Sequence, residues 1–350
     1  MLLTRDYIDP RDLTGYVREA LADREQNRFS LNRWLPNRPI NDLVYRFARG
    51  GQGLIEAATF RAWDAESPIH GRGQIQRVSG ELPPISRKLL LTEYDQLRLR
   101  NAPDDEVVGQ ILSDAVTLVR AIAGRIELAR GEALTTGAIR LEENGLVAEV
   151  DFGRDPDLTV APAVPWSDED APILSDLIAW RDKYEDVNGE PPGAIVTSRV
   201  VLARMLRNAE MRALVPATAG VLSPAGVLSP AALNDALTAY SLPTITTYDA
   251  RVKVDGVSTR IIPENVLLML PAPVAADAWE DTQLGATFWG TTAQALDPDF
   301  GIEASEAPGI VAGSYMEKDP PRRWTVASAV GLPVLANPDL SLAADTEPSS

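Results

Sequence analysis

Apolar residues recur at helical spacing through residues 104–136, the longest periodic pattern in the chain. Asp104, Asp105 and Glu106 open this stretch with negative charge, which favours the positive end of a helix dipole. Gly137 is suited to close the helix, because glycine adopts the left-handed backbone of a C-terminal cap at little cost. At 1.5 Å per residue, about 30 residues span roughly 45 Å. The pattern therefore predicts a long helix with an architectural role.

Shorter patterns predict an α+β fold around this helix. Runs of β-branched residues indicate strands, and Asn-Gly and Asp-Gly pairs indicate hairpin turns. Two hairpins are predicted, one from residues 138–141 and 146–152 and one from residues 244–254 and 258–262. Further strands are predicted at 194–197, 266–270 and 324–330, and helices at 172–184, 198–213 and 231–240. A Pro- and Asp-rich stretch at 153–172 predicts a domain boundary.

Residues 50–92 predict a long β-hairpin without a good apolar face. Its strands are expected at 54–63 and 74–82, its tip at 64–73 is polar and rich in turn-forming residues, and Pro83-Pro84 ends it. A hairpin of this kind is not stable in isolation. We therefore expect it either to be mobile or to be held by another subunit.

The stretch 26–50 is the most basic part of the chain, with five arginines against Asp42 alone. Pro36 and Pro39 argue against one continuous helix, and Trp34, Tyr45 and Phe47 are interleaved with the charges. One interpretation is a solvated N-terminal segment with scattered core aromatics. The favoured one is an extended arm that docks on an acidic neighbour or on nucleic acid, because a segment broken by prolines cannot easily bury so many aromatic rings by itself.

Composition excludes several classes of function. The chain has 33 Lys+Arg against 50 Asp+Glu, a net charge of −17, which excludes a general nucleic-acid coat. It has no Cys, which excludes disulfides and thiolate metal sites, and its single histidine, His70, excludes a multi-histidine site. No apolar run is long enough to predict a membrane span, and no signal peptide is predicted, so we expect an intracellular site of synthesis.

Charge is unevenly distributed along the sequence. Residues 1–100 carry 16 basic and 13 acidic side chains, whereas residues 101–350 carry 17 and 37. A basic segment and an acidic body in one chain attract each other in separate copies, which indicates self-association.

Catalytic motifs are missing from the sequence: it has no phosphate-binding loop, no dinucleotide fingerprint and no nucleophile elbow. The acids at 155–157, 168–170 and 297–299 could bind a hard cation, but acidic loops are more often simply solvated. His70 falls at the predicted hairpin tip, where it is a poor candidate for a general base. We therefore expect no catalytic residue, metal ligand or cofactor site. A direct repeat at 220–225 and 226–231 is interpreted as a tolerant loop.

A series of segments resembles the major capsid proteins of tailed phages, specifically the lambda-type capsid protein E family. Their order and spacing carry the resemblance, which covers residues from about 45 to 340. The segments are 125–137, 150–154, 166–168, 176–180, 248–270, 318–324 and 333–338.

The resemblance implies the HK-97 capsid fold, with an N-arm, an extended hairpin called the E-loop, a peripheral domain built on a long spine helix, and an axial domain. Carried onto this sequence, the N-arm is residues 1–53 and the E-loop residues 54–92. The peripheral domain is 93–165 and 316–350 with its spine helix at 104–136, and the axial domain is 166–315.

The function implied is that of a major head protein, which assembles into hexamers and pentamers that form an icosahedral shell around packaged double-stranded DNA. Implied partners are further copies of the chain, a separate scaffolding protein, a portal and a decoration protein, with no sequence-specific DNA binding and no membrane. The protein would be made in the host bacterial cytoplasm and reside in the virion capsid. Covalent cross-linking is not expected, because Lys88 lies at the base of the hairpin and not at its tip.

Residues from the basic segment and the hairpin are the candidates for contacts between subunits. They are Arg28, Arg33, Trp34, Arg38, Arg61, Trp63, His70, Arg72 and Arg77. Two alternatives remain at this stage. One is a phage tail or connector ring component, and the other is a carboxylate- or cation-dependent hydrolase that uses the acidic loop 155–170.

Overall fold

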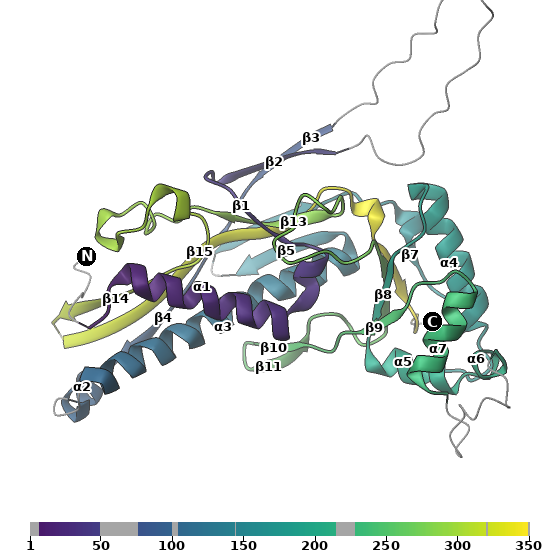
Figure 1. Ribbon diagram of the computed structural model, residues 1–350, viewed down its shortest axis with the longest axis horizontal. Helices are drawn as coiled ribbons and strands as arrows, with labels where there is room; N and C mark the ends of the chain where they lie inside the picture. The colour runs from purple at the N-terminus through teal and green to yellow at the C-terminus, as the bar shows by residue number, and fades with distance from the viewer. Residues whose placement is uncertain are drawn as a thin grey trace, which may run out of the picture.

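The computed structural model describes residues 7–49, 76–99, 104–143, 145–214, 228–319 and 321–348. Two five-stranded sheets organise the chain, and Figure 1 shows them toward opposite ends of an elongated molecule. One sheet carries the long helix, and the other is accompanied by four shorter helices. The mixed α+β class predicted from the sequence is confirmed.

The first sheet is built around one long strand, β15 (Pro321–Leu335). Its strand order is β1 (Asn37–Pro39), β13 (Gly285–Gly290), β15 and β14 (Val311–Lys318), and β4 (Pro84–Leu91) pairs with β15 as well. The strand predicted at 324–330 is therefore the middle of a strand of 15 residues. It is this long because β14 and β4 pair with residues 321–328 and 323–330 of its first part, and β13 pairs with residues 330–335 at its end.

Helix α3 (Asp104–Thr136) lies along this sheet with the bounds that the periodicity predicts. Helix α1 (Pro10–Asn27) packs on α3 and on β14, and a short helix, α2 (Glu93–Leu99), precedes α3. By length and apolar composition alone α3 could cross a membrane. In the structure its apolar stripe is instead buried on α1 and the sheet, so α3 serves as a core helix. Gly137 follows it with a φ of +73°, the left-handed conformation of a C-terminal cap.

The second sheet has the order β7 (Thr159–Val160), β16 (Leu342–Asp345), β12 (Val266–Leu270), β8 (Ala194–Thr197) and β9 (Ile245–Thr247). The helices that accompany it are α4 (Ile173–Asn188), α5 (Arg199–Arg207), α6 (Ala209–Ala213) and α7 (Pro230–Ala239). Strands β8 and β12 are buried throughout, as central strands covered on both faces are. Trp166 stacks on Trp180 in the core beside this sheet, with ring centroids 5.3 Å apart.

The single helix predicted at 198–213 is wrong, because the chain breaks at Asn208 into α5 and α6. Asn208 leaves the helical conformation and its Oδ1 accepts a hydrogen bond from Met211 N, which caps α6. Its amide group donates to the carbonyls of Glu169 and Ala171. A buried side chain that satisfies three backbone groups therefore outweighs helix continuity.

Three two-stranded hairpins stand outside the two sheets. They are β2 (Val44–Arg49) with β3 (Gln76–Glu81), β5 (Ala138–Glu143) with β6 (Leu146–Asp151), and β10 (Arg251–Val254) with β11 (Val257–Arg260). Positive φ values at Asp255 and Gly256 are those of the tight hairpin turn that the Asp-Gly pair predicts. The hairpin expected at 244–262 is only partly right, because 245–247 forms β9 and pairs with β8 in parallel.

The hairpin predicted over 54–92 needs correction at both ends. Its stem begins earlier, at β2, and β4 at 84–91 does not belong to it but is a strand of the first sheet. The strand expected at 54–63 and the tip at 64–73 lie outside the described residues. Figure 1 shows the stem β2–β3 projecting beyond the first sheet.

The expectation of an extended arm over residues 26–50 is also wrong for the residues that the structure describes. After α1, the chain makes a short 3₁₀ turn at Ser30–Arg33, and β1 then pairs in parallel with β13. Trp34 and Tyr45 are only 4% and 3% exposed. These two rings pack against distant parts of the same chain. Tyr45, for example, stacks on Phe288.

Sheet pairing also changes the expected domain limits. Strands β13 and β14, which were assigned to the axial part 166–315, lie in the first sheet with β15. Strand β16, which was assigned to the peripheral part, pairs with β12 in the second sheet. Each half is thus assembled from separated stretches of sequence, because strand partners are chosen by tertiary packing.

The core position of α3 gives a first testable prediction. Ile122 is 1% exposed among apolar residues of α1 and the sheet. Ile122→Asp places a carboxylate among these buried apolar side chains, and we expect loss of soluble, cooperatively folded protein. Thr117→Asp introduces the same charge at an exposed position of the same helix and should leave the melting temperature nearly unchanged. A soluble Ile122→Asp protein with a cooperative thermal transition would contradict this core assignment.

Candidate assembly surfaces and a buried polar network

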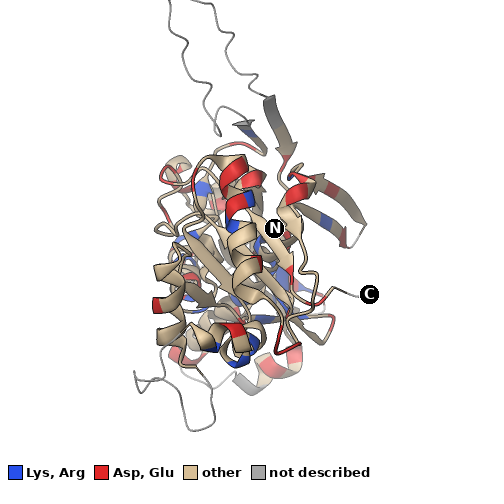
Figure 2. Ribbon diagram, turned by 90° about the vertical axis from the view of Figure 1, so that its right-hand side faces the viewer, with Lys and Arg blue, Asp and Glu red and all other residues tan. Residues whose placement is uncertain are grey.

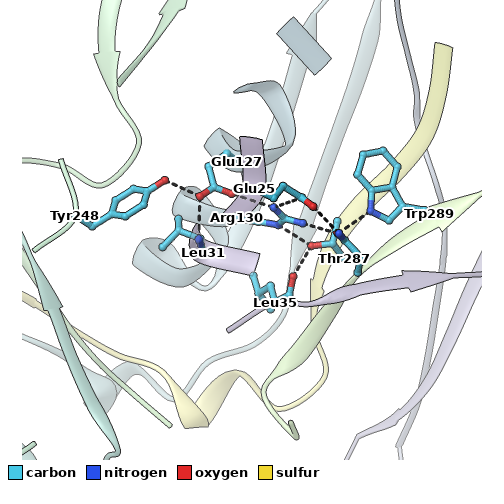
Figure 3. Close-up of polar contacts among 9 residues, drawn as sticks. Glu25, Leu31, Leu35, Glu127, Arg130, Tyr248, Thr287 and Trp289 are labelled. Atoms are coloured by element: carbon cyan, nitrogen blue, oxygen red, sulfur yellow. Dashed lines mark hydrogen bonds and ion pairs between the residues drawn. The ribbon is translucent and has the colours of Figure 1, made fainter. Parts of the chain in front are cut away.

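The most buried charges of the described structure meet around Arg130 of α3 (Figure 3). Its guanidinium donates from Nη1 to Glu25 Oε1 at 2.8 Å and to Glu127 Oε2 at 3.0 Å. The other nitrogens donate to Thr287 Oγ1 at 2.8 Å and to Asn37 Oδ1 at 2.7 Å. One side chain therefore connects α1, the segment that holds β1, α3 and β13.

The two carboxylates of this network are themselves satisfied. Glu127 Oε1 accepts from the backbone N–H of Leu31 at 2.9 Å and from the Tyr248 hydroxyl at 2.6 Å. Glu25 Oε2 accepts from the amide of Asn37 at 2.7 Å. Every charged group is paired and hydrogen-bonded, which is the condition under which buried charges are tolerated.

Burial and pairing act in opposite directions on the ionisation of this cluster. Burial by itself would lower the pKa of Arg130, but the charges of Glu25 and Glu127 outweigh burial and raise it. Burial raises the pKa of the Tyr248 phenol, and the neighbouring Glu127 carboxylate raises it further. Tyr248 is therefore a neutral hydrogen-bond donor, and Arg130 stays charged.

Sequence reasoning assigned no role to Glu127 or Arg130. A signal was available, because both residues lie three positions apart within the apolar stripe of the predicted helix. Charges at such positions require burial partners. Those partners, Glu25, Asn37 and Thr287, are 93 to 157 residues away from Arg130. The local pattern therefore indicates that partners are needed but does not identify them.

The predicted contact residues differ in their burial and in whether the structure describes them. Arg28 and Arg33 are exposed, as a contact between subunits requires. Trp34 is buried and its indole N–H donates to Pro271 O at 3.0 Å, so it is wrong as a contact candidate. Arg38 is half-buried, with its guanidinium 4.0 Å from the ring centre of Trp279. Only the backbone of Arg77 is described, in β3, and the others lie outside the described residues: Arg61, Trp63, His70 and Arg72.

The acidic loops have local roles. Asp155, Asp168 and Asp297 each accept a hydrogen bond from the backbone N–H two residues further on, which fixes a turn. Within the described ranges, no group of three or more His, Asp or Glu side chains could hold a metal ion. The arrangement thus gives no specific support to a cation site at residues 155–170.

Large apolar side chains are exposed on several projecting elements. They include Tyr94 and Leu97 on α2, Val147 on the β5–β6 hairpin, Val257 on the β10–β11 hairpin and Leu296 in the loop after β13, each more than half exposed. A groove of about 820 Å³ opens near the base of the stem β2–β3 and is lined by Leu43, Leu82, Ile85 and Leu296 among others. Apolar surface spread over many projections is typical of a subunit that neighbours cover from several sides.

Comparison with known families identifies what kind of subunit this is. The family model described as phage major capsid protein E matches residues 11–346, nearly the whole chain. The chain belongs to the phage major capsid protein E family. It is therefore a shell protein of a phage head, and its place is the capsid of the virion.

Solved structures support the fold of this capsid protein. The putative capsid protein of a prophage of E. coli CFT073 has 15% identity and a TM-score of 0.60, over 95% of this chain and 98% of that one. A phage-related protein of Bordetella bronchiseptica RB50 has 15% identity and a TM-score of 0.61, over 94% and 95% of the two chains. The capsid of cyanophage P-SCSP1u matches at 9% identity and a TM-score of 0.50, over 89% and 86%. A sequence search among curated proteins found no match.

These matches confirm the HK-97-like capsid fold that the sequence predicted, and they indicate self-association into a shell. A tail or connector ring component and a carboxylate-dependent hydrolase are not favoured. The network around Arg130 holds together the body that carries the exposed apolar projections.

The network gives a second prediction. Arg130→Met removes the cation and leaves Glu25 and Glu127 buried without a counter-charge, so we expect the free energy of unfolding to fall by about 3–5 kcal/mol. Chemical denaturation of the unassembled subunit measures this. Arg199→Met breaks an ion pair whose arginine is 80% exposed and should hardly move the midpoint. Equal effects of the two substitutions would contradict the role given to Arg130.

Proposed function

We propose that this chain is the structural subunit of an icosahedral head that encloses packaged double-stranded DNA, and that it assembles as hexamers and pentamers. The proposal rests above all on the family match over residues 11–346. Its mechanism is association without catalysis: many modest contacts between copies add up to a large buried interface. Head-to-tail contacts that close into rings produce the capsomers.

We assign the two sheets to the two domains of the capsid fold, each of which makes its own contacts with neighbouring subunits. In the proposed arrangement, the first sheet with α3 forms the peripheral domain, and the second sheet with α4–α7 forms the axial domain, whose copies meet around the capsomer axes. The projecting stem β2–β3 begins the E-loop, which lies across a neighbouring subunit. Exposed Arg28 and Arg33, together with Arg77 of the stem, are the proposed contact residues that fall within the described elements.

Other partners follow from the same proposal. A separate scaffolding protein guides assembly, a portal occupies one vertex, and a decoration protein covers the finished shell. The subunit is made in the host bacterial cytoplasm and binds DNA without sequence preference. It carries out no reaction, in keeping with the local turn-forming roles of Asp155, Asp168 and Asp297.

Negative-stain electron microscopy tests the proposed function. The purified protein, expressed with and without a scaffolding partner, should form closed shells, or hexamers and pentamers. Tubes or single rings of one size would instead indicate a tail or connector component. A dispersed monomer under both conditions would overturn the proposal.

Charge reversal in the hairpin tests the contact it makes. Replacement of Arg61, Arg72 or Arg77 by Glu should lower the yield of particles, because each reversal opposes attraction to an acidic neighbour. The melting temperature of the unassembled subunit should stay unchanged, since the described stem β2–β3 lies outside both sheets. Normal particle yield from all three variants would remove the hairpin from the assembly contacts.

A further inference from the structure

A basic groove stands out on this acidic protein. It has a volume of about 920 Å³ and lies between the middle of α3, β4 and the β10–β11 hairpin. Gly124 of α3 lets the hairpin come close, since a Cβ at that position would lie 3.2 Å from Val252 Cγ1. The lining has only three acidic side chains but six cationic ones. The cations are Arg24, Arg87, Arg120, Arg125, Arg251 and Lys253.

Most of these cations have no counter-charge. Among the described residues only Arg125 of the six forms an ion pair, with Glu143 at 3.0 Å. The groove residues Arg87, Arg120, Arg251 and Lys253 are exposed. A chain with 50 acidic residues could easily have neutralised them, yet the described structure pairs only one of the six cations and leaves four of them exposed.

The arginines at one end of the groove repel one another. Burial lowers the pKa of Arg24, and the like charges of Arg28 and Arg120 lower it further, against the opposing charge of Asp23. The guanidinium of Arg24 lies 4.6 Å from the ring centre of Phe29, and its Nε is buried without a hydrogen-bond partner. Gathering these like charges costs free energy that an anionic ligand would recover.

Within the described residues, Glu143 is the only acidic side chain that pairs with a cation of this groove. On the face shown in Figure 2, Asp and Glu residues are scattered over helices and loops instead of being gathered into one segment. By contrast, the proposed function, on which this inference rests, places DNA at very high local concentration against one face of every subunit. Duplex DNA presents one negative charge per about 1.7 Å along its axis, a density suited to cations spread over several elements.

We propose that this basic groove binds the phosphate backbone of the packaged duplex. Its cations come from α1, β4, α3 and the β10–β11 hairpin. Because they are spread over four elements, they can contact several successive phosphates of one duplex. The lining offers guanidinium and ammonium donors to phosphate oxygens, which gives binding without sequence preference. A local site of this kind is compatible with a net charge of −17, because the remaining surface repels DNA and keeps the contact weak and limited to the groove.

Fluorescence anisotropy with a labelled DNA duplex and unassembled subunits at low ionic strength tests the site. Wild-type binding should weaken with salt, with a slope of log affinity against log salt of about −0.9 per phosphate contacted. The double variant Arg120→Glu/Lys253→Glu should bind on the order of tenfold more weakly and with a slope shallower by roughly 2. Two duplexes of unrelated sequence should bind equally.

A matched control separates the groove from overall charge. Arg207→Glu/Lys318→Glu changes the net charge by the same amount at two exposed positions that do not line the groove. It should keep nearly wild-type affinity and slope. Thermal melting of both double variants should match that of the wild type, because all four side chains are exposed. An equal loss of DNA binding in the two double variants, or no binding by the wild type, would overturn the proposal.

Assembly and competition distinguish the remaining outcomes. If the groove double variant binds DNA normally but no longer forms shells, the groove is a contact between protein subunits and the proposal fails. If polyglutamate binds the wild type with groove-dependent affinity and DNA does not, the ligand is an acidic protein segment and the proposal fails as well. Failure of the wild type itself to form shells would instead contradict the proposed function.

Discussion

The ion and hydrogen-bond network around Arg130 is the interaction on which the arrangement of this protein depends. It is placed where α1, the strand β1, the long helix and the first sheet converge, and each partner comes from a different element (Figure 3). A buried guanidinium is stable only where its hydrogen bonds are satisfied and its charge is balanced. The network therefore specifies one position for the N-terminal segment, since displacement of Glu25 or Asn37 would leave charges buried without partners.

This constraint explains why the basic segment is not a free arm. The rings of Trp34 and Tyr45 are buried on the body, and Glu127 accepts a hydrogen bond from the backbone of the same segment at Leu31. The charges that remain outside, such as Arg28 and Arg33, are exposed. The segment thus has two faces: an apolar and hydrogen-bonding face that builds the subunit, and a cationic face available to partners.

A well-packed body with incompletely packed projections suits a shell protein. Two sheets and the long helix form the core, whereas the hairpins, α2 and the loop after β13 expose large apolar side chains. In the proposed shell such side chains gain burial when copies assemble, which divides stability between folding of the subunit and closure of the shell. The basic groove adds a charged surface to the subunit, because most of its cations form no ion pair within the described residues.

The sequence by itself determined the elements whose signals are local. The long helix has the predicted bounds, and the tight turn at Asp255-Gly256 lies where the dipeptide places it, because helical periodicity and turn chemistry depend on residues within a few positions. The order of short segments was also enough to indicate the capsid family. Only the tertiary structure decided which strands pair, where Asn208 interrupts a helix, and which groups satisfy Arg130. Those outcomes depend on residues up to about 250 positions apart, as between Thr287 and Leu35, and no local pattern carries that information.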